Sequence, residues 1–358
     1  MDSVKIENAE NSIILKNVMA ELMNKDNLRM TAAEKFDQYY YGHGKLLLTG
    51  EYFILDGAQG LALPTCVGQS MGIRYEQSYS PKLNWKSYDV HGNLWLEANF
   101  EFWHFNILDE NPSEEVIQLQ KILKQARIQN KHFLRDSQDV YVQTQLGFPR
   151  EWGLGSSSTL LYNTAQWAYT SPFELAKETF GGSGYDIACA GSDGPIIYHL
   201  EEGSPHWSTV SFFPEFHENL YFVYLGSKQN TRDSINEYRK KYQVKESEIE
   251  RINQITSELV NCVDFNHFCN LIGEHEQLVS GAIGVDPIAK KFSDFKGSLK
   301  SLGAWGGDFI LAGSEEMNFE EVQNYFSSHG LKTVIPFKEF ILPNPQVMAN
   351  QSISDMIQ

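Results

Sequence analysis

The sequence lacks the features that would direct it to a membrane, to secretion or to a zinc site. No uninterrupted apolar run approaches the ~20 residues of a membrane-spanning helix. The acidic, polar start "MDSVKIENAENS" does not resemble a signal peptide. The four cysteines form no CxxC pair and show no zinc spacing with histidine. We therefore expect free thiols in a cytoplasmic protein without a membrane partner. These cysteines are Cys66, Cys189, Cys262 and Cys269.

Basic residues are also scarce in this chain. Lys and Arg number 29 against 46 Asp and Glu, so the formal net charge is −17, and the longest basic run is "RKK" at 239–241. A surface this negative repels phosphate backbones, which argues against nucleic acid as a partner. An anionic small-molecule substrate would need local positive charge. Arg150, Lys228 and Arg232 could supply it, or could simply be solvated surface cations.

The length and the apolar content allow two domains. The 358 residues are 42% hydrophobic and 13% aromatic, enough for a sizeable core. Strand-like stretches dominate 36–110, where "DVHGN" indicates a hairpin turn, and 113–130 has a helical pattern. Helical patterns return over 233–280, and strands over 295–313. This mixture predicts an α+β fold. We expect an extension over 1–35, a first domain over 36–210 and a second over 211–358.

One glycine- and serine-rich segment stands directly in front of an apolar helical pattern, "EWGLGSSSTLLYNTAQWA" at 151–168. Glycine allows close backbone approach, and the first N–H groups of a helix have no intrahelical partner. With the helix dipole, these groups form an anion site that suits phosphate. The alternative interpretation is an ordinary helix cap. The segment lacks the third glycine of a dinucleotide fingerprint and the glycines of a GxSxG elbow, and the chain contains no GxxxxGK[ST].

Two further segments carry charged residues next to glycine. In "GHGKLLLTGEYFILDG" (42–57), Lys45 opens an apolar strand, where it could also be a solvated strand end. In "GGSGYDIACAGSDG" (181–194), Asp186 follows a glycine-rich turn, where it could also bond only to its own backbone. Together with the glycine-serine segment, the two suggest a phosphate-handling site.

The three segments resemble motifs of the GHMP kinase superfamily, which includes galactokinase, homoserine kinase, mevalonate kinase and phosphomevalonate kinase. The family motif PGK, a strand and G-E is matched by "HGKLLLTGEY", GLGSSA by "GLGSSS", and GAGGG before a strand by "GAWGGDFILA" from Gly303. "GSGYDIA" and "NTRDSI" (230–235) resemble segments of the mevalonate and phosphomevalonate kinases. The resemblance spans about 36–315. It implies a ribosomal-protein-S5-like N-terminal domain, a ferredoxin-like C-terminal domain and an active site between them.

This resemblance implies phosphoryl transfer from ATP, with Mg²⁺, to mevalonate or a similar hydroxy acid. Asp186 would accept or orient the proton of the attacking hydroxyl, and Lys45 would neutralise the transferring charge. Ser157 and Glu174 would bind the metal, although spacing does not separate Glu174 from Glu178. The implied substrate-binding residues are Glu51, Thr231 and Arg232. The implied ATP-binding residues are Gly153, Leu154, Gly155, Ser156, Ser157, Ser158, Gly303, Gly306 and Gly307.

Several residues depart from the family pattern. His43 stands in place of proline, Trp152 and Trp305 in place of small residues, and Ser158 in place of alanine. Trp305 would narrow the loop of the third motif, which begins at Gly303, unless its ring turns away from ATP. These departures leave room for an altered nucleotide preference or for lost catalysis.

Several functions therefore stay open. "NTR" favours a mevalonate kinase, whereas "GGD" at 306–308 is closer to a phosphomevalonate kinase. The related diphosphomevalonate decarboxylase also uses ATP, and a non-catalytic binding protein could share the fold. The presence of Lys45, Ser157 and Asp186 together argues against a mere binder.

Overall fold

The computed structural model describes residues 35–226, 238–240, 242–303, 305 and 307–345. The expected extension over 1–35, apart from its last residue, lies outside the described residues. Thr231, Arg232, Gly306 and Lys228 lie outside them as well. The described part of the chain contains no helix that is both long and apolar enough to cross a membrane.

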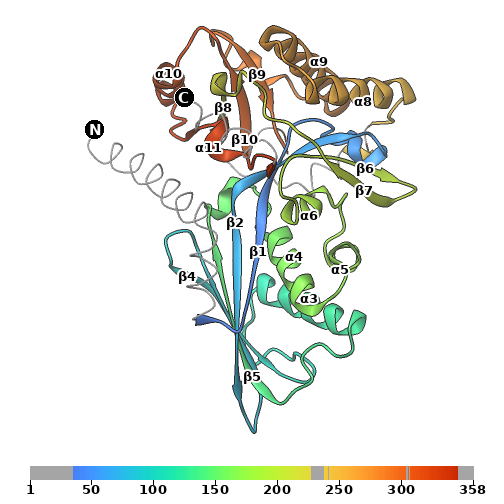
Figure 1. The fold of residues 1–358 in the computed structure, drawn as a ribbon, viewed down its shortest axis with the longest axis vertical. Helices are drawn as coiled ribbons and strands as arrows, with labels where there is room; N and C mark the ends of the chain where they lie inside the picture. The colour runs from blue at the N-terminus through green and yellow to red at the C-terminus, as the bar shows by residue number, and fades with distance from the viewer. Residues whose placement is uncertain (1–34, 227–237, 241, 304, 306, 346–358) are drawn as a thin grey trace.

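The first part of the chain forms a mixed sheet covered by helices on one face (Figure 1). Its strand order is β4-β3-β5-β2-β6-β7, with β1 paired to β2, and only the β3–β5 pair is parallel. The hairpin expected around "DVHGN" is confirmed as β3–β4, closed by a hydrogen bond from Asp89 N to Asn93 O (3.0 Å). The strands are β1 (Gln38–Leu47), β2 (Gly60–Gln77), β3 (Lys82–Tyr88), β4 (Leu94–Glu101), β5 (Gln138–Leu146), β6 (Ile196–Glu201) and β7 (Ser204–Thr209).

Two helices of this part, α3 and α5, begin at serine caps that the sequence supplies. The helix expected over 113–130 is confirmed as α3, where the Ser113 side chain accepts from Val116 N at the start. Ser171 caps α5 in the same way, with Pro172 in its first turn. The helices are α3 (Glu114–Gln129), α4 (Ser156–Ala168), α5 (Pro172–Thr179) and α6 (Tyr185–Ala190), and the 3₁₀ turns are η1 (Phe53–Asp56) and η2 (Arg150–Trp152).

The second part forms an antiparallel sheet in the order β11-β8-β10-β9. Along the chain, its strands and helices follow the βαββαβ order of ferredoxin-like folds, with α8 and α9 in the described part of the first connection. The helical stretch expected over 233–280 is divided, because α8 ends at Val260 and Asp264 caps a new helix by accepting from His267 N (2.7 Å). The elements are η3 (His217–Asn219), β8 (Leu220–Tyr224), α8 (Glu246–Val260), α9 (Phe265–Ile283), η4 (Ile288–Lys290), β9 (Ser298–Ser301), β10 (Phe309–Gly313), α10 (Phe319–Ser328), β11 (Val334–Pro336) and α11 (Phe337–Phe340).

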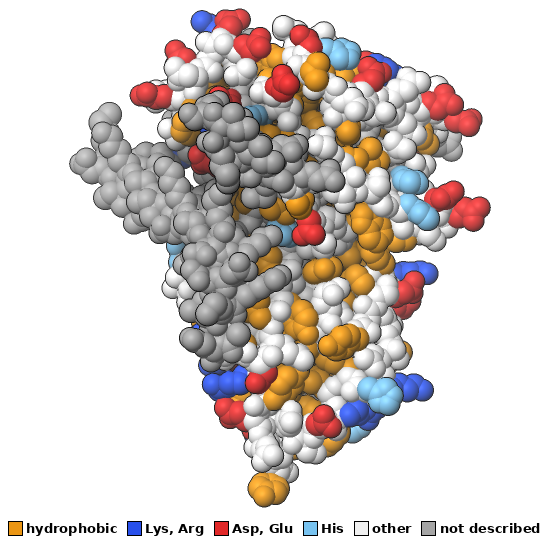
Figure 2. Space-filling model, in the orientation of Figure 1, with side chains coloured by type: hydrophobic (Ala, Val, Ile, Leu, Met, Phe, Trp, Pro, Cys, Tyr) orange, Lys and Arg blue, Asp and Glu red, His pale blue; other side chains and the backbone are white. Residues whose placement is uncertain are grey.

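One apolar core runs through both parts of the chain. Leu46 and Leu154 from the first part share a cluster of buried side chains with Phe222, Phe309 and Phe340 from the second. The observed class is therefore α+β, as expected. The boundary expected near residue 210 falls between β7 and β8, and the division into two domains stays a prediction. Figure 2 shows acidic side chains spread over the upper part of one face, in keeping with the net charge.

Candidate functional site

The glycine-serine segment forms a tight turn at the start of α4. Gly153 (φ 66°) and Gly155 (φ 86°) both have left-handed backbones, which favour glycine. A Cβ added at Gly153 would overlap the carboxyl group of Asp308, so a side chain has no room there. Ser156 and the exposed Ser157 begin the helix, whose first N–H groups have no intrahelical acceptor. Helix starts of this kind can bind anions, and the ATP-binding role expected for this turn stays a prediction.

Lys45 reaches this turn from the neighbouring strand β1. Its Nζ donates to Gly153 O (2.8 Å), and its backbone N donates to Leu154 O (3.1 Å). Burial alone would lower the pKa of Lys45, but Tyr185, Asp308 and Asp186 nearby raise it above the ordinary value. The ammonium group is therefore held charged beside the turn, so Lys45 is not an ordinary solvated strand end.

Asp186 lies in the first turn of α6, next to the start of α4. The Ser158 hydroxyl donates to Asp186 Oδ2, and Asp186 Oδ1 accepts from Ile187 N (3.0 Å). The carboxylate thus makes both the expected local backbone bond and a bond to the glycine-serine turn. Gly184 before the helix has φ 86°, and a Cβ there would lie 3.2 Å from the Tyr198 hydroxyl, which donates to Ser183 O in the turn before Asp186.

The third glycine motif connects β9 to β10. Gly303 (φ 68°) begins this connection, and Gly307 is buried within it. Asp308 ends it with a left-handed backbone (φ 55°), which is uncommon for a residue with a side chain. Its carboxylate packs directly against Gly153, in the space that a side chain at position 153 would occupy. Sequence reasoning assigned Asp308 no role in the site; an acidic residue closing a glycine run was the available signal.

The two tryptophans that replace small residues both turn into the core. Trp152 is 4% exposed and packs edge-on against Phe309 and Phe340, with ring centroids 5.5 and 6.1 Å away. Trp305 is buried in a cluster with Tyr52 and Phe53, and its backbone N donates to the Tyr52 hydroxyl (3.4 Å). Both rings are therefore buried in the core rather than exposed at their glycine loops.

A magnesium site of the expected composition would have few ligands from the protein. Glu174 is exposed in the first turn of α5, where its N–H donates to Ser171 Oγ (3.3 Å), and Glu178 is exposed too. Among the described residues, no group of three or more His, Cys, Asp or Glu could hold a metal ion. Magnesium bound with phosphates often takes only one or two protein ligands. The hydroxyls at the start of α4 fit that mode, and the roles of Ser157 and Glu174 stay predictions.

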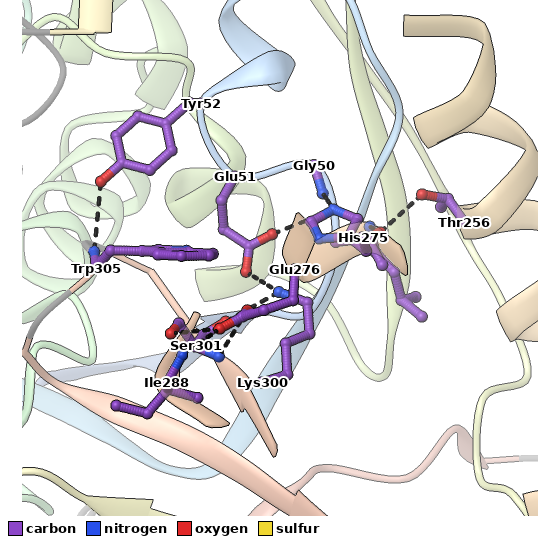
Figure 3. A network of polar contacts seen from close by, with 12 residues as sticks. Gly50, Glu51, Tyr52, Thr256, His275, Glu276, Ile288, Lys300, Ser301 and Trp305 are labelled. Atoms are coloured by element: carbon purple, nitrogen blue, oxygen red, sulfur yellow. Dashed lines mark hydrogen bonds and ion pairs between the residues drawn. The ribbon is translucent and has the colours of Figure 1, made fainter. Parts of the chain in front are cut away.

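Glu51 lies away from any exposed surface. It is 2% exposed and its Oε1 accepts from Lys300 Nζ (2.5 Å), while Oε2 lies 3.4 Å from His275 Nε2 (Figure 3). Burial raises the pKa of Glu51 to about 7, although the Lys300 ammonium opposes this shift. The substrate contact expected for Glu51 stays a prediction, and the structure places this carboxylate in a buried ion pair.

Comparison with solved structures shows that several small-molecule kinases share this fold. A mevalonate kinase from L. major in complex with R-mevalonate is 14% identical, with a TM-score of 0.60, and the match covers 86% of this chain and 96% of that one. A phosphomevalonate kinase from Streptococcus pneumoniae in complex with phosphomevalonate and AMPPNP is 16% identical, with a TM-score of 0.62 and coverages of 83% and 99%. A D-glycero-D-manno-heptose 1-phosphate kinase from B. thetaiotaomicron is 16% identical, with a TM-score of 0.56 and coverages of 86% and 96%.

These similarities establish the fold. No protein-family model matches the sequence, and a comparison with curated proteins gives no match. The resemblance noted in the three motifs is thus confirmed at the level of the fold.

Proposed function

We propose that this protein is an ATP-dependent kinase that phosphorylates a small hydroxy acid, with mevalonate as the first candidate. The observation that carries the proposal is the convergence of separate segments on one turn: Lys45 from β1, Asp186 from α6 and Asp308 from the β9–β10 connection surround residues 153–158. Phosphoryl transfer asks mainly for positioning and electrostatic stabilisation, which such a turn with one buried ammonium group can supply.

Each residue has a distinct part in this proposal. The N–H groups at the start of α4 would bind the phosphates, and Lys45 would neutralise charge on the transferring group. Asp186 would take the proton from the acceptor hydroxyl as its oxygen attacks the γ-phosphorus and the bond to the β–γ bridging oxygen breaks. Ser158 holds Asp186 at the turn. Bound Mg²⁺ would supply further charge neutralisation at the phosphates, with Ser157 and Glu174 as candidate ligands.

The acceptor is the least constrained part of the proposal. The similar solved structures carry names of kinases that act on mevalonate, phosphomevalonate and a heptose phosphate. Phosphomevalonate kinase is the second candidate, because the "GGD" sequence at 306–308 resembles that of phosphomevalonate kinases. A decarboxylase or a non-catalytic binder has less support, because Lys45 and Asp186 both lie at the turn.

The test is ADP release by the purified protein with Mg-ATP, offering mevalonate and 5-phosphomevalonate separately. We expect turnover with one acceptor and a loss of ~10²- to 10⁴-fold in kcat for Asp186→Asn. Asp193→Asn is the matched control, because Asp193 follows the same helix but is exposed. Full activity in Asp186→Asn would remove its role as the base. Absence of ATP binding by the unmodified protein would contradict the kinase proposal itself.

A further inference from the structure

A network of buried polar groups joins the two parts of the protein. Glu51, His275 and Lys300 point toward one another from the segment after β1, from α9 and from β9 (Figure 3). His275 and Lys300 are fully buried, and Glu51 is 2% exposed. Lys300 Nζ donates to both Glu51 Oε1 (2.5 Å) and Ser301 O (2.9 Å). A single ammonium group thus bonds to both parts at once.

The segment that carries Glu51 is held tightly on its own side. Gly50 has φ 85°, and a Cβ there would lie 2.8 Å from Gln59 O, so only glycine fits. The Gly50 N–H donates to His275 Nε2 (2.8 Å). Glu51 follows Lys45 closely along the chain, so the network fixes the end of the strand that carries Lys45.

The other side of the network fixes the start of the third glycine motif. Glu276 accepts from Ser301 N (3.0 Å), from Ser301 Oγ (2.9 Å) and from Ile288 N (3.1 Å). Ser301 ends β9, just before Gly303. Glu276 is 2% exposed, so these bonds are shielded from water. The position of the β9–β10 connection is therefore set by the same network that holds Glu51.

Stability alone does not explain a buried ion pair. Removing two charges from water is costly, and apolar residues of similar size often stabilise a fold equally well. What the pair adds is a directional link between two parts of the chain that each contribute to the site. The Glu51–Lys300 bond spans 249 positions in sequence and connects the strand of Lys45 with the hairpin of Asp308.

We infer that Glu51 and Lys300 are positioning residues that set the distance between Lys45 and the third glycine motif, rather than ligands of the substrate. The inference deepens the proposed function and rests on it for its catalytic consequence. With the pair neutralised, the Lys45 strand and the β9–β10 hairpin lose their fixed separation. The turn at Gly153, held from one side by Lys45 and from the other by Asp308, then loosens.

The test compares three variants with the unmodified protein. The double variant Glu51→Gln/Lys300→Met removes both charges of the pair together, so that neither partner is left without the other. Glu51→Asp keeps the charge but shortens the side chain, and it gives a graded result should the double variant fail to fold. Arg251→Met/Glu274→Gln is the matched control, because this pair (2.6 Å) joins α8 to α9 on the surface and does not link the two parts.

Two readouts are measured in each protein: kcat and KM for ATP, and amide hydrogen exchange in β1, β9 and β10. We expect kcat/KM to fall by about 10²-fold in the double variant, the scale of a misplacement near 1 Å. We expect a smaller loss in Glu51→Asp and none in the control. Exchange should quicken at the end of β1 and in β9 while other strands stay protected. Unchanged exchange together with unchanged kcat/KM would overturn the inference.

The exchange readout also separates this inference from the proposed function. If the unmodified protein binds no ATP, the kinase proposal fails, yet local exchange in β1 and β9 still reports whether the pair couples them. If kcat/KM falls while exchange changes nowhere, Glu51 acts on the substrate directly and the positioning role is wrong.

Discussion

The carboxyl group of Glu51 gives the stability of the protein a pH dependence that one substitution can isolate. Burial raises its pKa to about 7 from an ordinary value of 4.5, although the Lys300 ammonium lowers it in part. Between these pH values the folded chain keeps a proton on Glu51 that the unfolded chain has released. The stability contributed by this group is therefore fully present below about pH 4.5 and is lost as pH rises through 7.

His275 acts in the opposite direction within the same network. Burial and the Lys300 charge lower its pKa well below the ordinary value of 6.5, so below that pH only the unfolded chain gains a proton. From about pH 4.5 to 6.5 the folded chain holds one extra proton on Glu51 and lacks one on His275. The effects of the two groups on the pH dependence of the unfolding free energy therefore cancel in this range. Glu276 also faces Glu51 and raises its pKa further.

Glu51→Gln removes the contribution of Glu51 to the pH dependence of the unfolding free energy and leaves the contribution of His275. The difference in unfolding free energy between the unmodified protein and Glu51→Gln should fall by about 1.4 kcal/mol for each unit that the pH rises between about 4.5 and 7, or roughly 3 kcal/mol in all. Urea unfolding at half-unit pH steps, followed by tryptophan fluorescence, measures this difference. His275→Gln should change the difference in the opposite sense below about pH 6.5. A pH-independent difference for Glu51→Gln would refute a raised pKa and the reasoning from burial.

Three further substitutions test the geometry of the site. Gly153→Ala should destabilise the fold by more than Gly181→Ala in urea unfolding. Both glycines have left-handed backbones, which cost a residue with a side chain ~1–2 kcal/mol, but only a Cβ at position 153 would also meet Asp308. Equal losses in unfolding free energy would contradict that contact. Asp308→Asn should shift the alkaline limb of the pH profile of kcat/KM to lower pH, since its charge helps to raise the pKa of Lys45; an unmoved limb would separate the two residues. Trp152→Ala should cost ~3–5 kcal/mol in thermal or urea unfolding, whereas a ring turned to the site would cost far less.

The local conformations were predictable from the sequence because glycine marks them. Gly153, Gly155 and Gly303 all adopt the left-handed backbone that their motifs require. Helix starts with Ser113 and Ser171 followed equally local rules, since a cap involves residues only three apart. The identity of the fold also followed from these short motifs, because their order along the chain is specific even where sequence identity is low.

The partners of Glu51 could not be predicted in this way. The sequence shows that a glutamate follows the strand, but it does not show that the side chain is buried, because its burial depends on residues far along the chain. Lys300 lies 249 positions away, and His275 contacts the neighbouring Gly50 across 225 positions. No periodicity connects such segments. Asp308 was missed for a similar reason, since its contact with Gly153 exists only once the second sheet packs on the first part.

The two tryptophans show how a departure from a family motif can be compatible with an intact site. A bulky residue in a phosphate-binding turn suggests obstruction only if its side chain and the N–H groups of the turn face the same way. At Trp152 the next residue, Gly153, has a left-handed backbone (φ 66°) and ends the short 3₁₀ turn that carries the tryptophan. The indole ring packs into the core against Phe309 and Phe340, while Ser157 in the first turn of α4 stays exposed. Because Trp152 packs on the second sheet, the same substitution that looks obstructive also anchors the turn to the part of the chain that carries Asp308.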